Sequence, residues 1–203
     1  MKKSFIIIAL IATLFAQTLN AKEIRSMFGF YLDLPNGYEA IQNLNLNELL
    51  KDNPDADINK EFLNDMMTGT AKGDMDVEYF FPMTKLNPKF NNLYITHAKT
   101  NIKEFMSFDF QILCDGMKDL FAGLWNRPTI KQFECVKNPR EITIKSPLSV
   151  RLVHEGPFKK TKMFNYYFEV YRGFTTTVSL LCETKNCRKL EKDLIKMTNS
   201  INK

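Results

Sequence analysis

The strongest constraint on the fold is a pair of apolar segments joined by a tight turn near the C-terminus. Residues 162–171 and 174–182 flank Arg172-Gly173, a two-residue connection in which Gly173 can supply the positive φ of a hairpin turn. Successive side chains of a strand alternate between its two faces. Both faces of the first segment are apolar: one carries Phe164, Tyr166, Phe168 and Val170, and the other carries Met163, Tyr167 and Tyr171. The pattern predicts an antiparallel hairpin whose first strand is covered on both sides.

Other segments with a two-residue period predict further strands. A first strand over 24–34 ends at Pro35-Asn36-Gly37, which has strong turn chemistry. From Thr129 the period is again two, so Cys135 shares a strand face with Phe133. The remaining expected strands are 75–81, 93–97, 141–145 and 149–155.

Helical periodicity indicates two longer helices. Asn101 and Glu104 form a capping-box pattern. It precedes a nineteen-residue apolar stripe made by Met106, Phe110, Leu113, Met117, Leu120 and Leu124. A C-terminal helix over 187–201 has the stripe Leu190, Leu194, Met197 and Ile201, and a shorter helix is expected after Asp57. Strands and helices together predict one α+β domain over 22–203, a mainly antiparallel sheet flanked by helices in an α/β/α sandwich-like arrangement.

The first 21 residues have the layout of a secretory signal peptide. Lys2 and Lys3 precede an eleven-residue apolar run over 5–15, polar residues follow, and Ala21 is a small residue at a plausible cleavage position. The alternative is an uncleaved anchor, but a membrane-spanning helix needs about 20 apolar residues. We therefore expect residues 1–21 to be a transient signal, the only membrane-directed segment, and the protein to be periplasmic or secreted.

Export affects the interpretation of the four cysteines, because thiols outside the cytoplasm are usually oxidised. Proximity in the sequence favours the pairs Cys114–Cys135 and Cys182–Cys187 among three possible connectivities. A metal site is the alternative. The chain has no Cys-x-x-Cys motif, and its two histidines, His97 and His154, are far apart in the sequence. We predict structural disulfides and no metal or other cofactor.

The net charge is too small to name a ligand. The chain has 203 residues and a net charge of +5, and removal of residues 1–21 takes away two lysines and no acid, which leaves +3. This balance gives no reason to expect nucleic acid as a partner. A candidate basic patch before and around the hairpin could meet an anionic partner or could be a solvated turn; it comprises Arg151, Lys159, Lys160, Lys162 and Arg172.

No motif predicts a catalytic residue. His154-Glu155 could pair as a general base and its partner, yet adjacent strand residues point to opposite faces. His97 follows Leu93 and Ile95 on one strand face, which is more typical of a core or edge histidine. An acidic cluster that lacks EF-hand spacing is better explained by helix capping and a solvated loop; it contains Asp52, Asp55, Asp57 and Asp65.

Both ends of the chain resemble PsbP-like domains. The opening FGFYLDLPNGYE and the ending YYFEVYRGFTTTVSLLC followed by CRKLEKDLIKMTNSI carry this resemblance, which covers about a quarter of the chain. This superfamily includes extrinsic photosystem subunits and a Ran-binding nuclear-import factor, and its members look like binding or accessory modules. The resemblance implies a large antiparallel sheet between helices, and it transfers no active-site or metal residue.

The sequence thus predicts a noncatalytic exported protein that engages an envelope protein or a small ligand. The alternative is a small periplasmic enzyme that uses His97 or His154. A histidine close to a carboxylate in a cleft would favour the enzyme.

Overall fold

The computed structural model describes residues 21–40, 77–82, 90–99, 109–146 and 148–202. Most of the expected signal peptide, the helix expected after Asp57, the acidic cluster and the capping box of Asn101 and Glu104 lie outside these residues.

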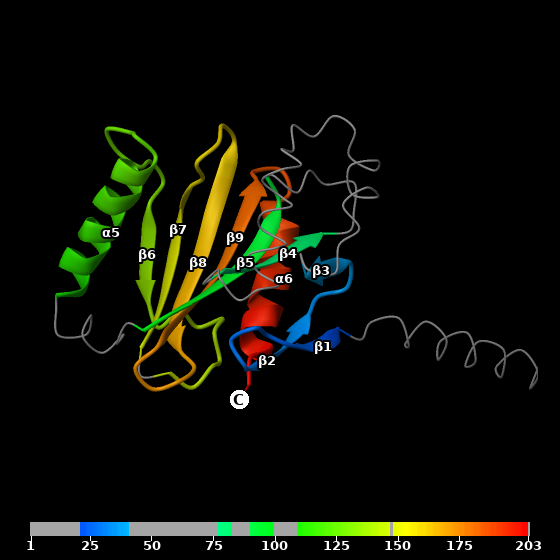
Figure 1. Cartoon of the computed structure of the whole chain (residues 1–203). Coiled ribbons are helices and arrows are strands. Elements are labelled where there is room, and N and C mark those ends of the chain that lie inside the picture. The colour runs from blue at the N-terminus through cyan, green and yellow to red at the C-terminus, as the bar shows by residue number, and fades with distance from the viewer. Residues whose placement is uncertain (1–20, 41–76, 83–89, 100–108, 147, 203) are drawn as a thin grey trace, which may run out of the picture.

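A seven-stranded antiparallel sheet forms the centre of the molecule (Figure 1). Its strand order is β3-β4-β5-β9-β8-β7-β6, so the C-terminal hairpin supplies two of its inner strands. The strands are β3 (Tyr38–Ala40), β4 (Val77–Pro82), β5 (Asn92–Ala98), β6 (Glu134–Lys137), β7 (Ser149–Glu155), β8 (Thr161–Glu169) and β9 (Thr175–Glu183). Helices α5 (Phe110–Leu124) and α6 (Cys187–Ser200) accompany the sheet, which confirms the predicted α+β class.

The first predicted strand is in fact a hairpin, β1 (Lys22–Arg25) paired with β2 (Tyr31–Leu34). The chain reverses between them, because the Ser26 N–H donates to the Phe30 carbonyl at 2.8 Å and the Gly29 N–H donates to the Ser26 carbonyl at 2.9 Å. Gly29 adopts φ = 92°, a conformation that favours glycine. The prediction of one strand over 24–34 was wrong because it took this glycine as a strand residue.

The C-terminal hairpin is present, but its connection is longer than predicted. β8 ends at Glu169, which pairs with Thr175, so five residues link the strands. Within the link the Phe174 N–H donates to the Tyr171 carbonyl at 3.0 Å, and Gly173 has φ = 82°. A two-residue link would pair Tyr171 with Phe174 and shift the register by one. The observed register instead places Asn165 opposite Ser179.

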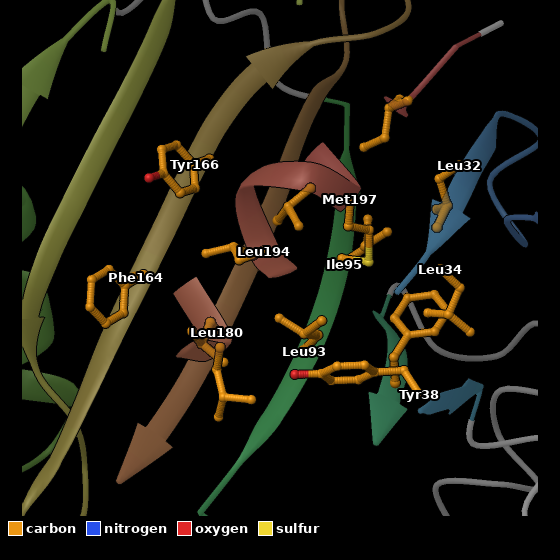
Figure 2. Close-up of a cluster of buried hydrophobic side chains, with 14 of the residues drawn as sticks. Leu32, Leu34, Tyr38, Leu93, Ile95, Phe164, Tyr166, Leu180, Leu194 and Met197 are labelled. Carbon is orange, nitrogen blue, oxygen red and sulfur yellow. The ribbon is translucent and has the colours of Figure 1, made fainter. Parts of the chain in front are cut away.

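The main hydrophobic core lies between one face of the sheet and α6 (Figure 2). The predicted α6 stripe is confirmed: Leu190, Leu194, Met197 and Ile201 are all buried. They pack against every second side chain of the neighbouring strands, on the sheet face that α6 covers; examples are Leu93, Ile95, Phe164, Tyr166 and Leu180.

A second, smaller core lies on the opposite face of the sheet, beneath α5. Leu148, Val150 and Leu152 are buried there, and Phe110, Met117 and Phe121 of α5 pack against them. Because Leu152 and Val153 are neighbours on β7 but belong to different cores, the two helices cover opposite faces. This is the expected α/β/α layering.

The helix α5 differs from its prediction in two respects. It begins at Phe110, where the Asp109 carboxylate accepts a hydrogen bond from the Gln111 N–H at 2.8 Å. The predicted stripe is also partly wrong, since Leu120 and Leu124 are 52% and 67% exposed. The buried side is centred on Cys114, Met117 and Phe121 instead. The disulfide of Cys114 fixes this side of the helix toward the sheet.

The segment 141–145, predicted as a strand, is irregular. Its backbone pairs with a side chain of α6 rather than with a neighbouring strand. The Thr143 N–H donates to Asn199 Oδ1 at 2.8 Å, and Asn199 Nδ2 donates to the Glu141 carbonyl at 2.8 Å. Ile142 and Ile144 still pack against the main core, which explains their alternation.

No helix among the described residues has the length and apolar character needed to cross a membrane.

Candidate functional site

Both predicted cysteine pairs lie at disulfide distance. Cys114 of α5 pairs with Cys135 of β6, with their Cα atoms 6.0 Å apart. Cys182 near the end of β9 pairs with Cys187 at the start of α6, with Cα atoms 5.3 Å apart. The disulfides therefore fasten each helix to the sheet, one on each face.

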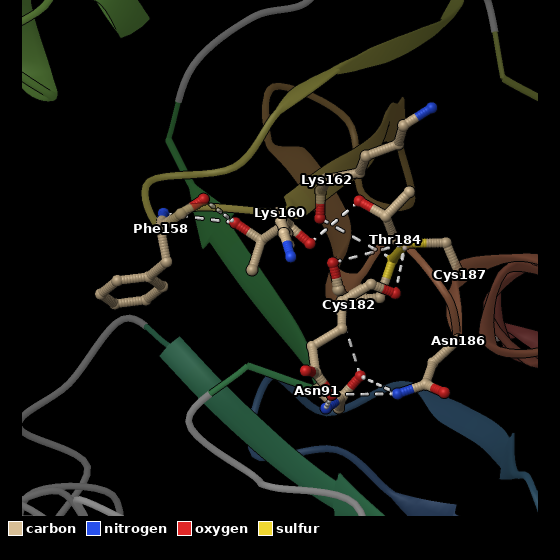
Figure 3. Close-up of a disulfide and its surroundings, with 10 residues drawn as sticks. Asn91, Phe158, Lys160, Lys162, Cys182, Thr184, Asn186 and Cys187 are labelled. Atoms are coloured by element: carbon tan, nitrogen blue, oxygen red, sulfur yellow. Dashed lines mark hydrogen bonds between the residues drawn. A yellow bond between two sulfur atoms is a disulfide. The ribbon is translucent and has the colours of Figure 1, made fainter.

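The turn between β7 and β8 is anchored next to the second disulfide (Figure 3). The Thr184 N–H and the Thr184 hydroxyl both donate to the Lys160 carbonyl at 2.9 Å. Inside the turn, the Thr161 hydroxyl donates to the Phe158 carbonyl at 2.7 Å. Lys160 itself has φ = 60°. These bonds fix the backbone of the turn that carries Lys159 and Lys160.

Three of the five residues of the candidate basic patch are brought together by this turn. Lys159, Lys160 and Lys162 line a polar pocket of about 400 Å³. Arg127, which the sequence interpretation did not include, lines the same pocket and pairs with Glu155 at 3.6 Å. The pocket therefore presents four cationic side chains and one carboxylate.

The other two residues lie elsewhere. Arg151 is on β7 and contacts three carboxylates, Glu134 at 2.7 Å and Glu141 and Glu191 at 3.3 Å. Its charge is thus already paired, and it links β6, the irregular segment and α6. Arg172 lies in the turn after β8, whereas Lys159 and Lys160 precede this nine-residue strand and Lys162 is its second residue, so the length of β8 separates Arg172 from the lysines by about 30 Å.

His154 is fully buried on the α5 side of the sheet, where its ring contacts Phe121. Its Nδ1 lies 2.9 Å from the Glu155 carbonyl and its Nε2 lies 3.1 Å from Asn165 Nδ2. The Ser179 hydroxyl donates to Asn165 Oδ1 at 2.7 Å, and Ser179 is also hydrogen-bonded to Tyr94. A polar row thus runs across β7, β8, β9 and β5.

The bonds of this row make His154 a neutral imidazole. Asn165 Nδ2 can only donate, so Nε2 of His154 accepts, and the Glu155 carbonyl can only accept, so Nδ1 carries the proton. Burial lowers the pKa of His154, although the backbone bond to Glu155 works in the opposite direction. Three aromatic rings surround the imidazole, with centroids 4.4 to 6.0 Å away: Phe121, Trp125 and Phe133.

His97 lies in a second aromatic enclosure on the α6 side. Its ring stacks on Phe174 with centroids 4.9 Å apart, and its Nδ1 lies 2.9 Å from the Thr176 hydroxyl. Burial lowers the pKa of His97 as well. The rings of Phe28, Phe30 and Tyr171 complete the enclosure.

An apolar cavity of about 210 Å³ lies between α5 and the sheet. Its lining carries no charged side chain among the described residues; its polar groups are the hydroxyls of Tyr167, Thr175 and Thr177. The remaining lining residues are Ala98, Leu113, Met117, Cys135, Leu148, Val150 and Leu152.

The outward side of α5 is also apolar in part. Ile112 is 65% exposed, and with Leu120 and Leu124 it lies within about one third of the helix circumference, given 100° per residue. Among the described residues, no group of three or more His, Cys, Asp or Glu side chains converges as metal ligands would.

The whole-chain comparison identifies the architecture that carries these features. The structure is similar to the solution structure of the cyanobacterial PsbP protein (CyanoP) from Synechocystis sp. PCC 6803. The TM-score is 0.52 at 10% sequence identity, and the match covers 91% of this chain and 92% of the other. This chain has a PsbP-like fold. No family model and no curated protein matches its sequence.

Within this PsbP-like fold, sequence reasoning missed both the polar row and the cavity. The signal for the row was present, since Asn165 and Ser179 interrupt otherwise apolar strands. The cavity left no such signal, because its lining residues are ordinary core residues drawn from five strands, the loop before β7 and α5.

Proposed function

We propose that the protein is a noncatalytic accessory protein of the cell envelope that is exported and then binds a partner molecule. The observation that carries the proposal is the state of the two histidines. His154 is fully buried and His97 is half-buried, both contact aromatic rings, and burial lowers the pKa of each. Their hydrogen-bonded partners are a threonine, an asparagine and a backbone carbonyl. General acid–base catalysis instead requires a histidine that can reach a substrate.

Three further observations support the proposal. The PsbP-like fold is shared with the cyanobacterial PsbP protein CyanoP. Two disulfides agree with an oxidising compartment. The basic pocket with Lys159 and Lys160, and the exposed apolar side of α5, offer surfaces for a partner.

Amine-reactive cross-linking in intact cells, followed by purification of the tagged protein, tests the proposal. We expect a discrete adduct in the extracytoplasmic fraction that persists in the His97→Gln and His154→Gln variants. Absence of any adduct would contradict the proposal. An activity of the purified protein that either substitution abolishes would establish the enzyme alternative.

A further inference from the structure

The cavity beneath α5 is shaped for a guest of hydrocarbon character. Leu148, Val150 and Leu152 form its floor, and Leu113 and Met117 of α5 form its cover. Native cores contain few voids larger than a water molecule. An apolar cavity of about 150 Å³ can take up a molecule of the size of benzene. By that scale, 210 Å³ accommodates a hydrocarbon of about eight carbons.

The polar groups of the lining are neutral. Thr175 and Thr177 contribute hydroxyls on the β9 side, and Tyr167 contributes its phenol from β8. Burial raises the pKa of Tyr167, so its hydroxyl keeps its proton at any physiological pH. A charged group would be desolvated inside this cavity without a counter-charge, which is costly. The guest must therefore keep any charge at the rim.

Lys137 supplies a cation beside the cavity, because it lies on the same face of β6 as Cys135, which lines the cavity. Lys137 is exposed on β6 and pairs with Val150, one of the floor residues. Its Nζ lies 6.0 Å from the ring centroid of Phe110, the first residue of α5, which packs on the same floor. A carboxylate attached to a chain in the cavity can reach this ammonium group and remain in contact with water.

We propose that the cavity binds the alkyl chain of a linear medium-chain fatty acid, with its carboxylate beside Lys137. This inference names a ligand class for the binding protein and in that sense rests on the proposed function. The small volume limits the length of the alkyl chain, and Lys137, paired with Val150 of the cavity floor, gives the carboxylate a counter-charge.

Titration calorimetry of the full mature protein with sodium hexanoate, octanoate and decanoate tests the proposal. We expect saturable one-to-one binding whose affinity rises by roughly fourfold per methylene up to about eight carbons and then levels off. Lack of saturable binding by octanoate and decanoate would overturn it. A continued rise through hexadecanoate would also overturn it, because such a chain would have to lie outside the cavity.

Two pairs of variants locate the ligand. Ala98 is exposed at the edge of the cavity, so Ala98→Phe should fill it and reduce octanoate affinity at least tenfold. Thr143→Phe, at an exposed loop position away from the cavity, should leave the affinity unchanged. Equal affinity in both variants would overturn the assignment. Thermal unfolding shows whether Ala98→Phe is folded.

Lys137→Gln tests the headgroup without touching the core. We expect octanoate affinity to fall by about twofold to fivefold, as for a partly exposed ion pair, while binding of uncharged 1-octanol is unchanged. Lys145→Gln, another exposed lysine, should change neither. An equal loss for octanoate and octanol would refute the carboxylate position.

These results separate the inference from the proposed function. If octanoate does not bind but a cross-linked partner is recovered from the envelope, the ligand assignment fails and the accessory role stands. If octanoate binds but the protein is never exported, the cavity assignment stands and the proposed role fails.

Discussion

Nε2 of His154 and Nδ2 of Asn165 are 3.1 Å apart, which makes the imidazole an acceptor at the centre of a buried polar row. Protonation of Nε2 would place two donors against each other. The row therefore links the stability of the sheet to the neutral form of His154.

The first prediction concerns pH. The pKa of His154 is lowered in the folded state, so between that lowered value and about 6.5 the unfolded chain binds more protons than the native protein. The contribution of His154 to the free energy of unfolding should thus be constant above about pH 6.5 and fall as the pH drops below it. Urea unfolding at pH 7.5 and 5.5 measures this, and His154→Gln should show a smaller loss. An NMR titration midpoint of His154 at or above 6.5 would refute the explanation.

The second prediction concerns Asn165, which is 2% exposed. Asn165→Ala removes the partner of both His154 and Ser179, and each buried unsatisfied group costs about 1 to 3 kcal/mol. We expect a loss of about 2 to 4 kcal/mol in chemical denaturation. Asn202→Ala, at an exposed position, should cost less than about 0.5 kcal/mol. Similar losses in the two variants would mean that the polar row does not stabilise the sheet.

The polar row also shows what the sequence could and could not predict. The alternation of Phe164, Tyr166 and Phe168 identified the two faces of β8 correctly, because side-chain period is a local property. The pairing of Asn165 with Ser179 could not be predicted from the sequence. The pairing depends on a five-residue connection between β8 and β9, whereas Arg172-Gly173 alone favoured a two-residue connection. A shift of one residue in the register changes every cross-strand partner.

The third prediction compares two arginines that the sequence placed in one basic patch. Arg151→Gln leaves Glu134, Glu141 and Glu191 without their shared cation and should destabilise the protein by about 1 to 2 kcal/mol, since the group is partly exposed. Arg172→Gln should shift the unfolding free energy by less than about 0.5 kcal/mol. The effect of Arg151→Gln should shrink at high salt. Equal thermal shifts for the two variants would contradict these assignments.

The location of these arginines also marks a limit of sequence reasoning. Lys159, Lys160 and Lys162 stay together because they are neighbours in the chain. Arg151 is paired through contacts with residues 10 to 40 positions away, which no local pattern reveals.

The fourth prediction concerns the disulfide between α5 and β6. Replacement of Cys114 and Cys135 by serine opens a loop of about 20 residues and should cost about 3 kcal/mol. Amide hydrogen exchange should then rise in α5 more than in α6, because α6 keeps Cys182–Cys187 and the larger core. The matched variant, with serine at Cys182 and Cys187, should cost about 2 kcal/mol because its loop is shorter. A uniform rise in exchange over both helices would show that the bridge does not act locally on α5.

The sequence predicted both disulfides and the helices they fasten, since cysteine spacing and helical period are readable in the chain. It predicted the buried side of α5 correctly for Phe110 and Met117, but not for the C-terminal half of the helix. Leu120 and Leu124 fit the periodic stripe, yet the bridge of Cys114 turns the helix so that Phe121 faces the sheet instead.

The central claim is that this PsbP-like domain works outside the cytoplasm as a two-disulfide binding protein. Its most direct test is the intact mass of the protein recovered from cells and alkylated under denaturing, nonreducing conditions. We predict a single species in the extracytoplasmic fraction that comprises residues 22–203, lacks four hydrogens and carries no alkyl group. A full-length species in the membrane fraction, or alkylation at two or more cysteines, would contradict the claim.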